Sequence, residues 1–137
     1  MKTIRFISIM MMFVAWSCSS NEGLSLKGTK WKLAGIVDAQ TGELTELEPK
    51  NCAECFTLTF DTNTTAHGKS IQNHVVILGL DPVSIVIATD VLDGPDGDIF
   101  CDIVQTALFN SYTLTINELK FFYNNNNNYL LYKRINQ

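Results

Sequence analysis

Short segments in which apolar and polar residues alternate make up much of this sequence. Residues 55–61 read CFTLTFD, with Phe56, Leu58 and Phe60 separated by threonines. Alternation with a period of two places the apolar side chains on one face of a β-strand. The same pattern predicts strands at 29–37, 66–70, 74–78, 84–88, 112–116, 119–123 and 129–135, and a shorter one at 44–47. Eight or nine short strands separated by turns predict a mainly β fold, an antiparallel sheet that forms a barrel, curves strongly or folds into a sandwich.

One segment has the periodicity of a helix rather than a strand. Apolar residues recur at spacings of three and four between Asp98 and Phe109, which predicts one helix over 98–109 with a single apolar side. This helix is expected to cover an open end or one face of the sheet. Asp96 or Asp98 is placed to cap its first turn, where carboxylates meet unpaired amide groups. The apolar stripe consists of Phe100, Ile103, Val104, Ala107 and Leu108.

Five consecutive asparagines at 124–128 predict a tight turn between two of the last strands. Asparagine tolerates left-handed backbone angles, which such turns require. We expect a solvated hairpin loop without a ligand.

The first seventeen residues have the pattern of an export signal. Lys2 and Arg5 precede an apolar run at 6–16, which is too short to cross about 30 Å of hydrocarbon as a helix. Small residues at positions 15 and 17 then lead to Cys18, an arrangement that resembles the lipobox of bacterial lipoproteins. We predict a lipoprotein signal peptide at 1–17 and lipid attachment at Cys18, the alternative being an ordinary secretory signal cleaved nearby. Residues 18–28 then form a flexible tether to a single domain at 29–137.

The charge of the chain narrows the class of partner. The full sequence has a formal net charge of −4, and residues 18–137 contain eight basic and fourteen acidic residues, which gives −6. No Lys or Arg lies between Lys69 and Lys120, whereas six aspartates do. An acidic chain without basic clusters does not suit nucleic acid. The expected partners are a membrane, reached through the N-terminal lipid, and an unknown protein, glycan or small molecule.

Cys52 and Cys55 form the sharpest local signal. Outside the inner membrane the environment is oxidising, which favours a disulfide over a thiolate metal site. A catalytic redox pair would stand at a helix N-terminus, whereas this pair precedes a predicted strand. A structural disulfide or a pair of free thiols is therefore expected. Cys101 lies near the apolar stripe of the predicted helix and is expected to be a small buried residue.

Two metal sites can be written from the sequence, and neither is favoured. Cys52, Cys55, His67 and His74 offer zinc ligands, but a zinc finger needs both histidines on a helix. Residues 93–98 offer carboxylates to Ca²⁺, but the spacing of an EF-hand and its distal glutamate are missing. Turn formation and helix capping explain the same aspartates. We predict no metal and no other cofactor.

The order of the segments is similar to that of a known family. Its motifs here are Leu26-x-Gly28-Thr29-x-Trp31-x-Leu33, Leu58-Thr59-Phe60, the acidic and aromatic helix, Ser111-Tyr112, and the hairpin from 119–123 to 130–132. Over residues 26–135 they resemble the META/HslJ-like domains of envelope lipoproteins, especially a branch seen in Bacteroidetes. Lipocalin-like lipoproteins share the opening glycine and tryptophan and are the alternative. The chain departs from META domains at 66–69, which read AHGK where a Gly-Cys-Asn stretch is usual.

This resemblance implies a small β-rich domain, lipid-anchored to the outer membrane, without established catalytic machinery. The sequence agrees, since it contains no Gly-x-Ser-x-Gly, no His-Glu-x-x-His and no glycine-rich phosphate loop. We therefore expect a non-catalytic envelope lipoprotein with a binding or accessory role.

Two other functions are considered beside it. A lipocalin-like carrier of a small apolar ligand would need an empty interior, whereas Trp31, Phe56, Phe60 and Phe121 occupy inward positions and are expected to fill it. A secreted or surface inhibitor would need a rigid exposed loop, for which 38–54 is the candidate.

Overall fold

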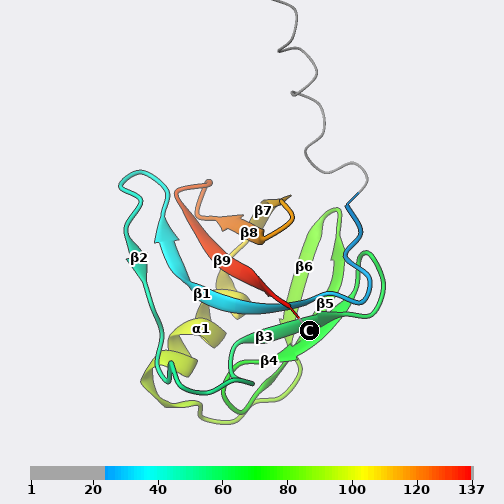
Figure 1. The fold of residues 1–137 in the computed structure, drawn as a ribbon. Helices are drawn as coiled ribbons and strands as arrows, with labels where there is room; N and C mark the ends of the chain where they lie inside the picture. Colours follow the sequence, from blue (N-terminus) through cyan, green and yellow to red (C-terminus); the bar gives the residue numbers. More distant parts are fainter. Residues whose placement is uncertain (1–23, 137) are drawn as a thin grey trace, which may run out of the picture.

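Nine strands and one helix make up the described part of the chain, residues 24–136 of a computed structural model (Figure 1). The predicted fold class, a mainly β chain with one helix, is confirmed. The predicted signal peptide, Cys18 and the first part of the tether lie outside the described residues. The elements are β1 (Lys30–Asp38), β2 (Leu44–Thr45), β3 (Thr57–Phe60), β4 (Ala66–Lys69), β5 (His74–Leu80), β6 (Val83–Ile87), α1 (Gly94–Thr106), β7 (Phe109–Leu114), β8 (Glu118–Tyr123) and β9 (Asn128–Ile135).

The strands form one antiparallel sheet in the order β6-β5-β4-β3-β1-β9-β8-β7. Apart from β2, which pairs with the end of β1, strands that follow each other along the chain are neighbours in space. The sheet curls until its two end strands, β6 and β7, contact each other, so it is a nearly closed up-and-down barrel. Helix α1 connects these end strands and contacts β6 (Figure 1).

Large aromatic side chains fill the interior of the barrel. Trp31, Phe60, Phe100 and Phe121 each have less than 2% of their surface exposed, and Phe56 has 2%. The rings of Phe56 and Phe100 meet edge to face with centroids 5.4 Å apart, which joins α1 to the strand side of the core. The prediction that the inward aromatic residues fill the interior is confirmed.

Helix α1 begins and ends earlier than predicted, at 94–106 rather than 98–109. Gly94 and Pro95, a pair typical of loops, form the first helical turn. Proline is tolerated there because the N–H groups of the first turn have no acceptor within the helix, so its missing N–H costs no hydrogen bond. Ala107 is extended and ends the helix, so Phe109 starts β7 and points inward. Leu108, predicted on the apolar stripe, is 78% exposed.

The helix cap also differs in detail from the prediction. The N-cap residue is Asp93. Asp98 accepts a hydrogen bond from the Asp93 N–H at 2.9 Å, whereas Asp96 accepts one from the distant Glu48 N–H at 2.6 Å. The two candidate carboxylates therefore hold the approach to the helix and the segment after β2.

Two connecting segments follow from their local sequence. Asn124, Asn125 and Asn126 have left-handed φ angles between β8 and β9, as the asparagine run predicts. At the other end of the chain, Leu26 is 3% exposed, and the Asn63 side chain accepts a hydrogen bond from its N–H at 3.1 Å. Leu26 was predicted to belong to the flexible tether, so this part of the prediction is corrected: an apolar residue that can reach the core packs there.

Candidate functional site

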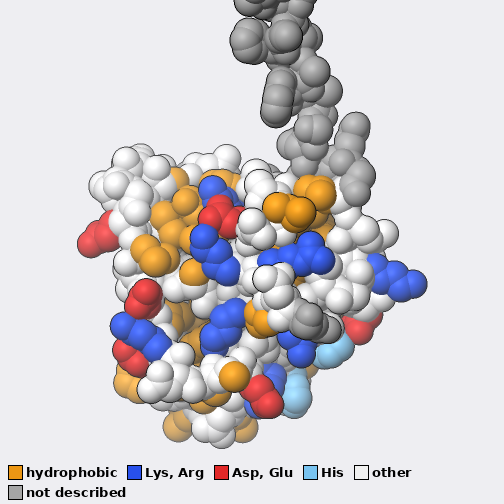
Figure 2. All heavy atoms as spheres, in the orientation of Figure 1, with side chains coloured by type: hydrophobic (Ala, Val, Ile, Leu, Met, Phe, Trp, Pro, Cys, Tyr) orange, Lys and Arg blue, Asp and Glu red, His pale blue; other side chains and the backbone are white. Residues whose placement is uncertain are grey.

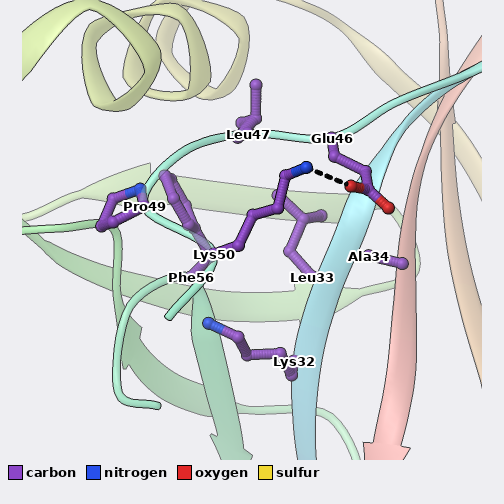
Figure 3. Close-up of a pocket in the computed structure, with 8 residues that line it drawn as sticks. All are labelled: Lys32, Leu33, Ala34, Glu46, Leu47, Pro49, Lys50 and Phe56. Atoms are coloured by element: carbon purple, nitrogen blue, oxygen red, sulfur yellow. Dashed lines mark ion pairs between the residues drawn. The ribbon is translucent and has the colours of Figure 1, made fainter. Parts of the chain in front are cut away.

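The segment after β2 runs beside β1 and borders a hollow of about 180 Å³ (Figure 3). Leu33 and Phe56 lie beneath it, while Lys50 extends across the opening toward Glu46. The alternation of β1 positions this site, because Leu33 faces the core and its neighbours Lys32 and Ala34 face outward. The hollow is lined by Lys32, Leu33, Ala34, Glu46, Leu47, Pro49, Lys50 and Phe56.

Both lysines of this first hollow, Lys32 and Lys50, already interact with acceptors of the protein itself. Lys50 Nζ lies 2.9 Å from a Glu46 carboxylate oxygen and 3.7 Å from one of Glu48, and the hydrogen bond and charge of Glu46 raise the pKa of Lys50. Lys32 Nζ donates to the carbonyl oxygens of Cys52 at 2.7 Å and Cys55 at 2.5 Å, and burial lowers its pKa. Lys32 thereby connects the segment after β2 to β1.

Cys52 and Cys55 are joined by a disulfide within the same segment. The Cys55 N–H also donates to the Cys52 carbonyl at 3.4 Å, so the bridge closes one tight turn. No helix follows it, since β3 begins at Thr57. Cys101 is a free thiol on α1 and is 8% exposed.

A second hollow, of about 300 Å³, lies on the outer face of β1, β3, β4 and β5. The strand register brings its side chains together: Lys30 is opposite Thr59, which is opposite His67, while Lys69 stands between Thr57 and His74. The disulfide-closed turn forms its rim through Ala53 and Glu54. The complete lining is Lys30, Ala53, Glu54, Thr57, Thr59, His67, Gly68, Lys69 and His74.

Gly68 allows β3 and β4 to approach closely beneath this second hollow. A Cβ atom at this position would lie 1.8 Å from the carbonyl oxygen of Thr57, so no side chain fits. The AHGK stretch that departs from the META pattern is strand β4. Its glycine is required sterically, because a side chain would collide with β3.

Only some of the titratable side chains in the second hollow have an internal partner. His67 Nδ1 lies 2.8 Å from a carboxylate oxygen of Asp61. Within residues 24–136, by contrast, no ion pair involves Lys30 or Lys69. Both lysines are half-buried, so their stems follow the sheet and their ammonium groups are left to interact with solvent or a ligand.

The four residues weighed as zinc ligands, Cys52, Cys55, His67 and His74, are brought only partly together. His67 and His74 share the second hollow, but the two nearby sulfur atoms are bonded to each other. The carboxylates of 93–98 do not converge either, because they point to separate hydrogen-bond partners. Across the described residues 24–136, no group of three or more His, Cys, Asp and Glu side chains is arranged to hold a metal ion.

Asp93 forms a buried connection that sequence reasoning missed. It is 2% exposed, and its carboxylate accepts hydrogen bonds from the Ser70 hydroxyl, the Ile71 N–H at 3.2 Å and the Gln72 N–H at 2.6 Å. Burial alone would raise the pKa of Asp93, but these hydrogen bonds outweigh it and hold the pKa below its usual value. Asp93 therefore fastens the start of α1 to the turn between β4 and β5.

A comparison with known proteins places the chain in a family. A curated protein of Tannerella forsythia with the printed name "Putative lipoprotein" is 40% identical over 139 residues, which span 96% of this chain and 95% of that protein. This chain belongs to the same lipoprotein family. No family model and no solved structure matches it. Within residues 24–136, no helix has the length and apolar character that crossing a membrane requires.

This lipoprotein-family domain separates its charges in space. We call residues 70–117, which include β5, β6, α1 and β7, the acidic sector; it contains six aspartates and no Lys or Arg. The rest of the described chain, residues 24–69 and 118–136, is the basic sector, with eight Lys or Arg and seven Asp or Glu. Figure 2 shows the basic side chains spread over the face that carries β1, β3, β4 and β9, with both histidines near one edge.

Proposed function

We propose that this chain is a lipid-anchored, non-catalytic protein of the bacterial envelope that binds a partner on the outer surface of its barrel. The printed name of the relative and the small residues before Cys18 both support anchoring at Cys18. Each buried methylene of an acyl chain contributes about 0.8 kcal/mol, so the two or three chains of a bacterial lipoprotein would hold the domain on a membrane. We place it at the outer membrane.

The observation that carries the choice of the outer surface is the filled interior. The up-and-down order of the strands is the one that lipocalins use. A lipocalin-like carrier, however, holds its ligand where this barrel has Trp31, Phe60, Phe100 and Phe121, all almost fully buried. A ligand could enter only by displacing such side chains from a close-packed core, where truncation of one large aromatic residue to alanine typically costs about 3–5 kcal/mol.

The fold also supports the proposal that this family is META-like. The strands and the helix occur in the order that the resemblance implies, and the glycine of the departing AHGK stretch is explained by the close approach of β3 and β4. An experimental structure would test the assignment by superposition on META domains and on lipocalins.

Anchoring is tested by expressing the full chain in a bacterium that processes lipoproteins. We expect the protein in the membrane fraction, and an N-terminal peptide whose mass corresponds to an acylated Cys18. The Cys18→Ser variant should lose both the lipid mass and the membrane association, whereas Ser20→Ala should keep them. An unmodified cysteine at the mature N-terminus would refute the anchoring.

The site of binding is tested with Trp31, which is the one tryptophan of residues 18–137. Its indole N–H donates to the Thr29 hydroxyl at 2.8 Å inside the core. Titration with a fatty acid or another apolar probe should leave its fluorescence unchanged if the interior is closed to ligands. Saturable quenching or a spectral shift would instead support the carrier function.

A further inference from the structure

We propose that the second hollow binds the phosphate group of a small phosphorylated ligand, with Lys30 and Lys69 as the two cations that recognise it. This rests on the proposed function, because it names the ligand chemistry of the outer surface. The hollow has about 300 Å³, at the lower end of the range of small-molecule sites. That size suits one sugar phosphate or one lipid headgroup.

The two lysines are positioned to reach the same anion. Lys30 on β1 and Lys69 on β4 flank β3 on its two sides and are offset by two residues along the strands, so their backbones are roughly 12 Å apart. A lysine side chain carries three N–H donors on a flexible stem, so both ammonium groups can turn toward one anion between them. Charge-assisted hydrogen bonds of this kind are about twice as strong as neutral ones.

Lys30 and Lys69 differ in their pairing from four other lysines of the basic sector. Lys50 is paired with Glu46 and Glu48, Lys120 and Lys133 are close to Glu118, and Lys32 donates to two carbonyl groups. These cations already have acceptors. Lys30 and Lys69 form no ion pair among the described residues, so an arriving anion does not have to displace an internal partner.

Neutral polar groups line the hollow around the two lysines. The Thr59 hydroxyl can donate to an oxygen of the ligand, whereas the Thr57 hydroxyl already donates to the Glu54 carbonyl oxygen at 2.9 Å and can only accept from the ligand. His67 and His74 add imidazole nitrogens from the two strands beyond. Two carboxylates lie nearby: Asp61 is held by His67, and Glu54 stands on the rim. We place the phosphate between Lys30 and Lys69, and the uncharged part of the ligand toward the threonines and histidines.

The experiment is a calorimetric titration of the purified mature protein, as it is processed in its host. The probes are glucose 6-phosphate, inorganic phosphate, glucose and a short-chain phosphatidylglycerol below its micelle concentration. We expect glucose 6-phosphate to bind and glucose not to bind. Equal affinity for inorganic phosphate would identify free phosphate as the ligand, and tighter binding of the phosphatidylglycerol would identify a lipid headgroup; both would support the site.

The matched variants separate this site from general charge effects. Lys30→Gln with Lys69→Gln should weaken binding of the phosphorylated probe about tenfold or more, because two charge-assisted contacts are lost. Lys50→Gln with Lys120→Gln removes the same charge elsewhere and should change the affinity by no more than about twofold, since exposed charges are screened over a Debye length. Thermal melting of both double variants shows whether the fold is kept.

Two results would overturn the proposal. One is no saturable binding of any phosphorylated probe by the wild-type protein up to about 50 mM, far weaker than a millimolar site. The other is an equal loss of affinity in the two double variants. The titration does not depend on the state of Cys18, so failure of the anchoring and failure of this site remain distinguishable.

Discussion

The acidic and the basic sectors of this barrel differ in the roles of three aspartates and two lysines. In the acidic sector, Asp93, Asp96 and Asp98 accept hydrogen bonds from backbone N–H groups and thereby connect loops to the helix. In the basic sector, Lys30 and Lys69 stand on the outer face without an ion pair among the described residues. Carboxylates therefore hold loops to the helix in the acidic sector, whereas Lys30 and Lys69 of the basic sector have no internal ion pair and form the proposed site.

The topology explains why these two uses are separated in space. In an up-and-down barrel, a continuous stretch of chain becomes a continuous sector, because successive strands are neighbours. The stretch from 70 to 117 has six aspartates and no basic residue, a formal charge of −6, while the remaining described residues have eight basic and seven acidic residues, a charge of +1. A bias in the linear sequence thus becomes a polarity of the whole domain, which can orient it toward anionic partners.

The largest expected effect is the loss of the buried carboxylate in the acidic sector. Asp93→Ala removes the acceptor of four donors, including the Cys101 thiol at 3.6 Å and the hydroxyl of Ser70, a residue with no exposed surface. Leaving buried donors unpaired costs about 1–3 kcal/mol each, so we expect a loss of about 3 kcal/mol or more in the free energy of unfolding. Urea denaturation measures it, with Asp102→Ala, an exposed aspartate of α1, as the control.

Equal stability of Asp93→Ala and Asp102→Ala would contradict a structural role for the buried carboxylate of the acidic sector. Substitution of an exposed residue away from special features normally stays within about 0.5 kcal/mol. A similar small loss in Asp93→Ala would mean that the carboxylate does not fasten α1 to the turn at 70–73.

Acid should weaken the same connection, because the pKa of Asp93 is lowered in the folded state. A lowered pKa means that the unfolded chain binds the proton more readily. The contribution of Asp93 is therefore complete above the usual pKa of aspartate and is lost as the pH falls through that value toward the lower folded one. Urea midpoints between about pH 6 and pH 2.5 should fall more steeply for the wild type than for Asp93→Asn. Parallel profiles would contradict this role.

In the basic sector, the disulfide should have a smaller effect than Asp93. It closes a loop of only four residues, 52–55, and the chain-entropy estimate for such a loop is about 2 kcal/mol. We expect the double substitution Cys52→Ser, Cys55→Ser to lower the free energy of unfolding by about that amount, as measured by urea denaturation. If the double variant had the same free energy of unfolding as the wild type, the disulfide would have no measurable role in holding the turn at 52–55 against β1.

Periodicity predicted most of the strands because most of them bury one face; β2, which is exposed, and β6, which has no buried residue, are exceptions. The inward aromatic residues were predicted for the same reason. The ends of α1 were not, since Gly94 and Pro95 suit a turn as well as a first helical turn, and only the start of β7 shows where the helix stops.

The sites were harder to predict than the strands, because they depend on distant segments. Asp93 meets the turn at 70–73 across about twenty residues, and no local pattern records that contact. Lys30 and Lys69 come together only because β1 pairs with β3, which pairs with β4. The sequence does show both histidines and the cysteine pair, but it does not show that the sulfur atoms are unavailable as ligands.

The smallest expected effect concerns a surface ion pair of the basic sector and sharpens the comparison with Asp93. Lys133 Nζ lies 2.5 Å from Glu118, and this hydrogen bond, together with the charges of Lys133 and Lys120, lowers the pKa of Glu118. Lys133→Gln should return that pKa toward its usual value in an NMR titration, yet change the free energy of unfolding by no more than about 1 kcal/mol, because the pair is partly exposed. Lys120→Gln, whose Nζ lies 4.0 Å from Glu118, should have a weaker effect on the same pKa. A loss of stability as large as that of Asp93→Ala would show that carboxylates are structural in both sectors, and would remove the distinction between them.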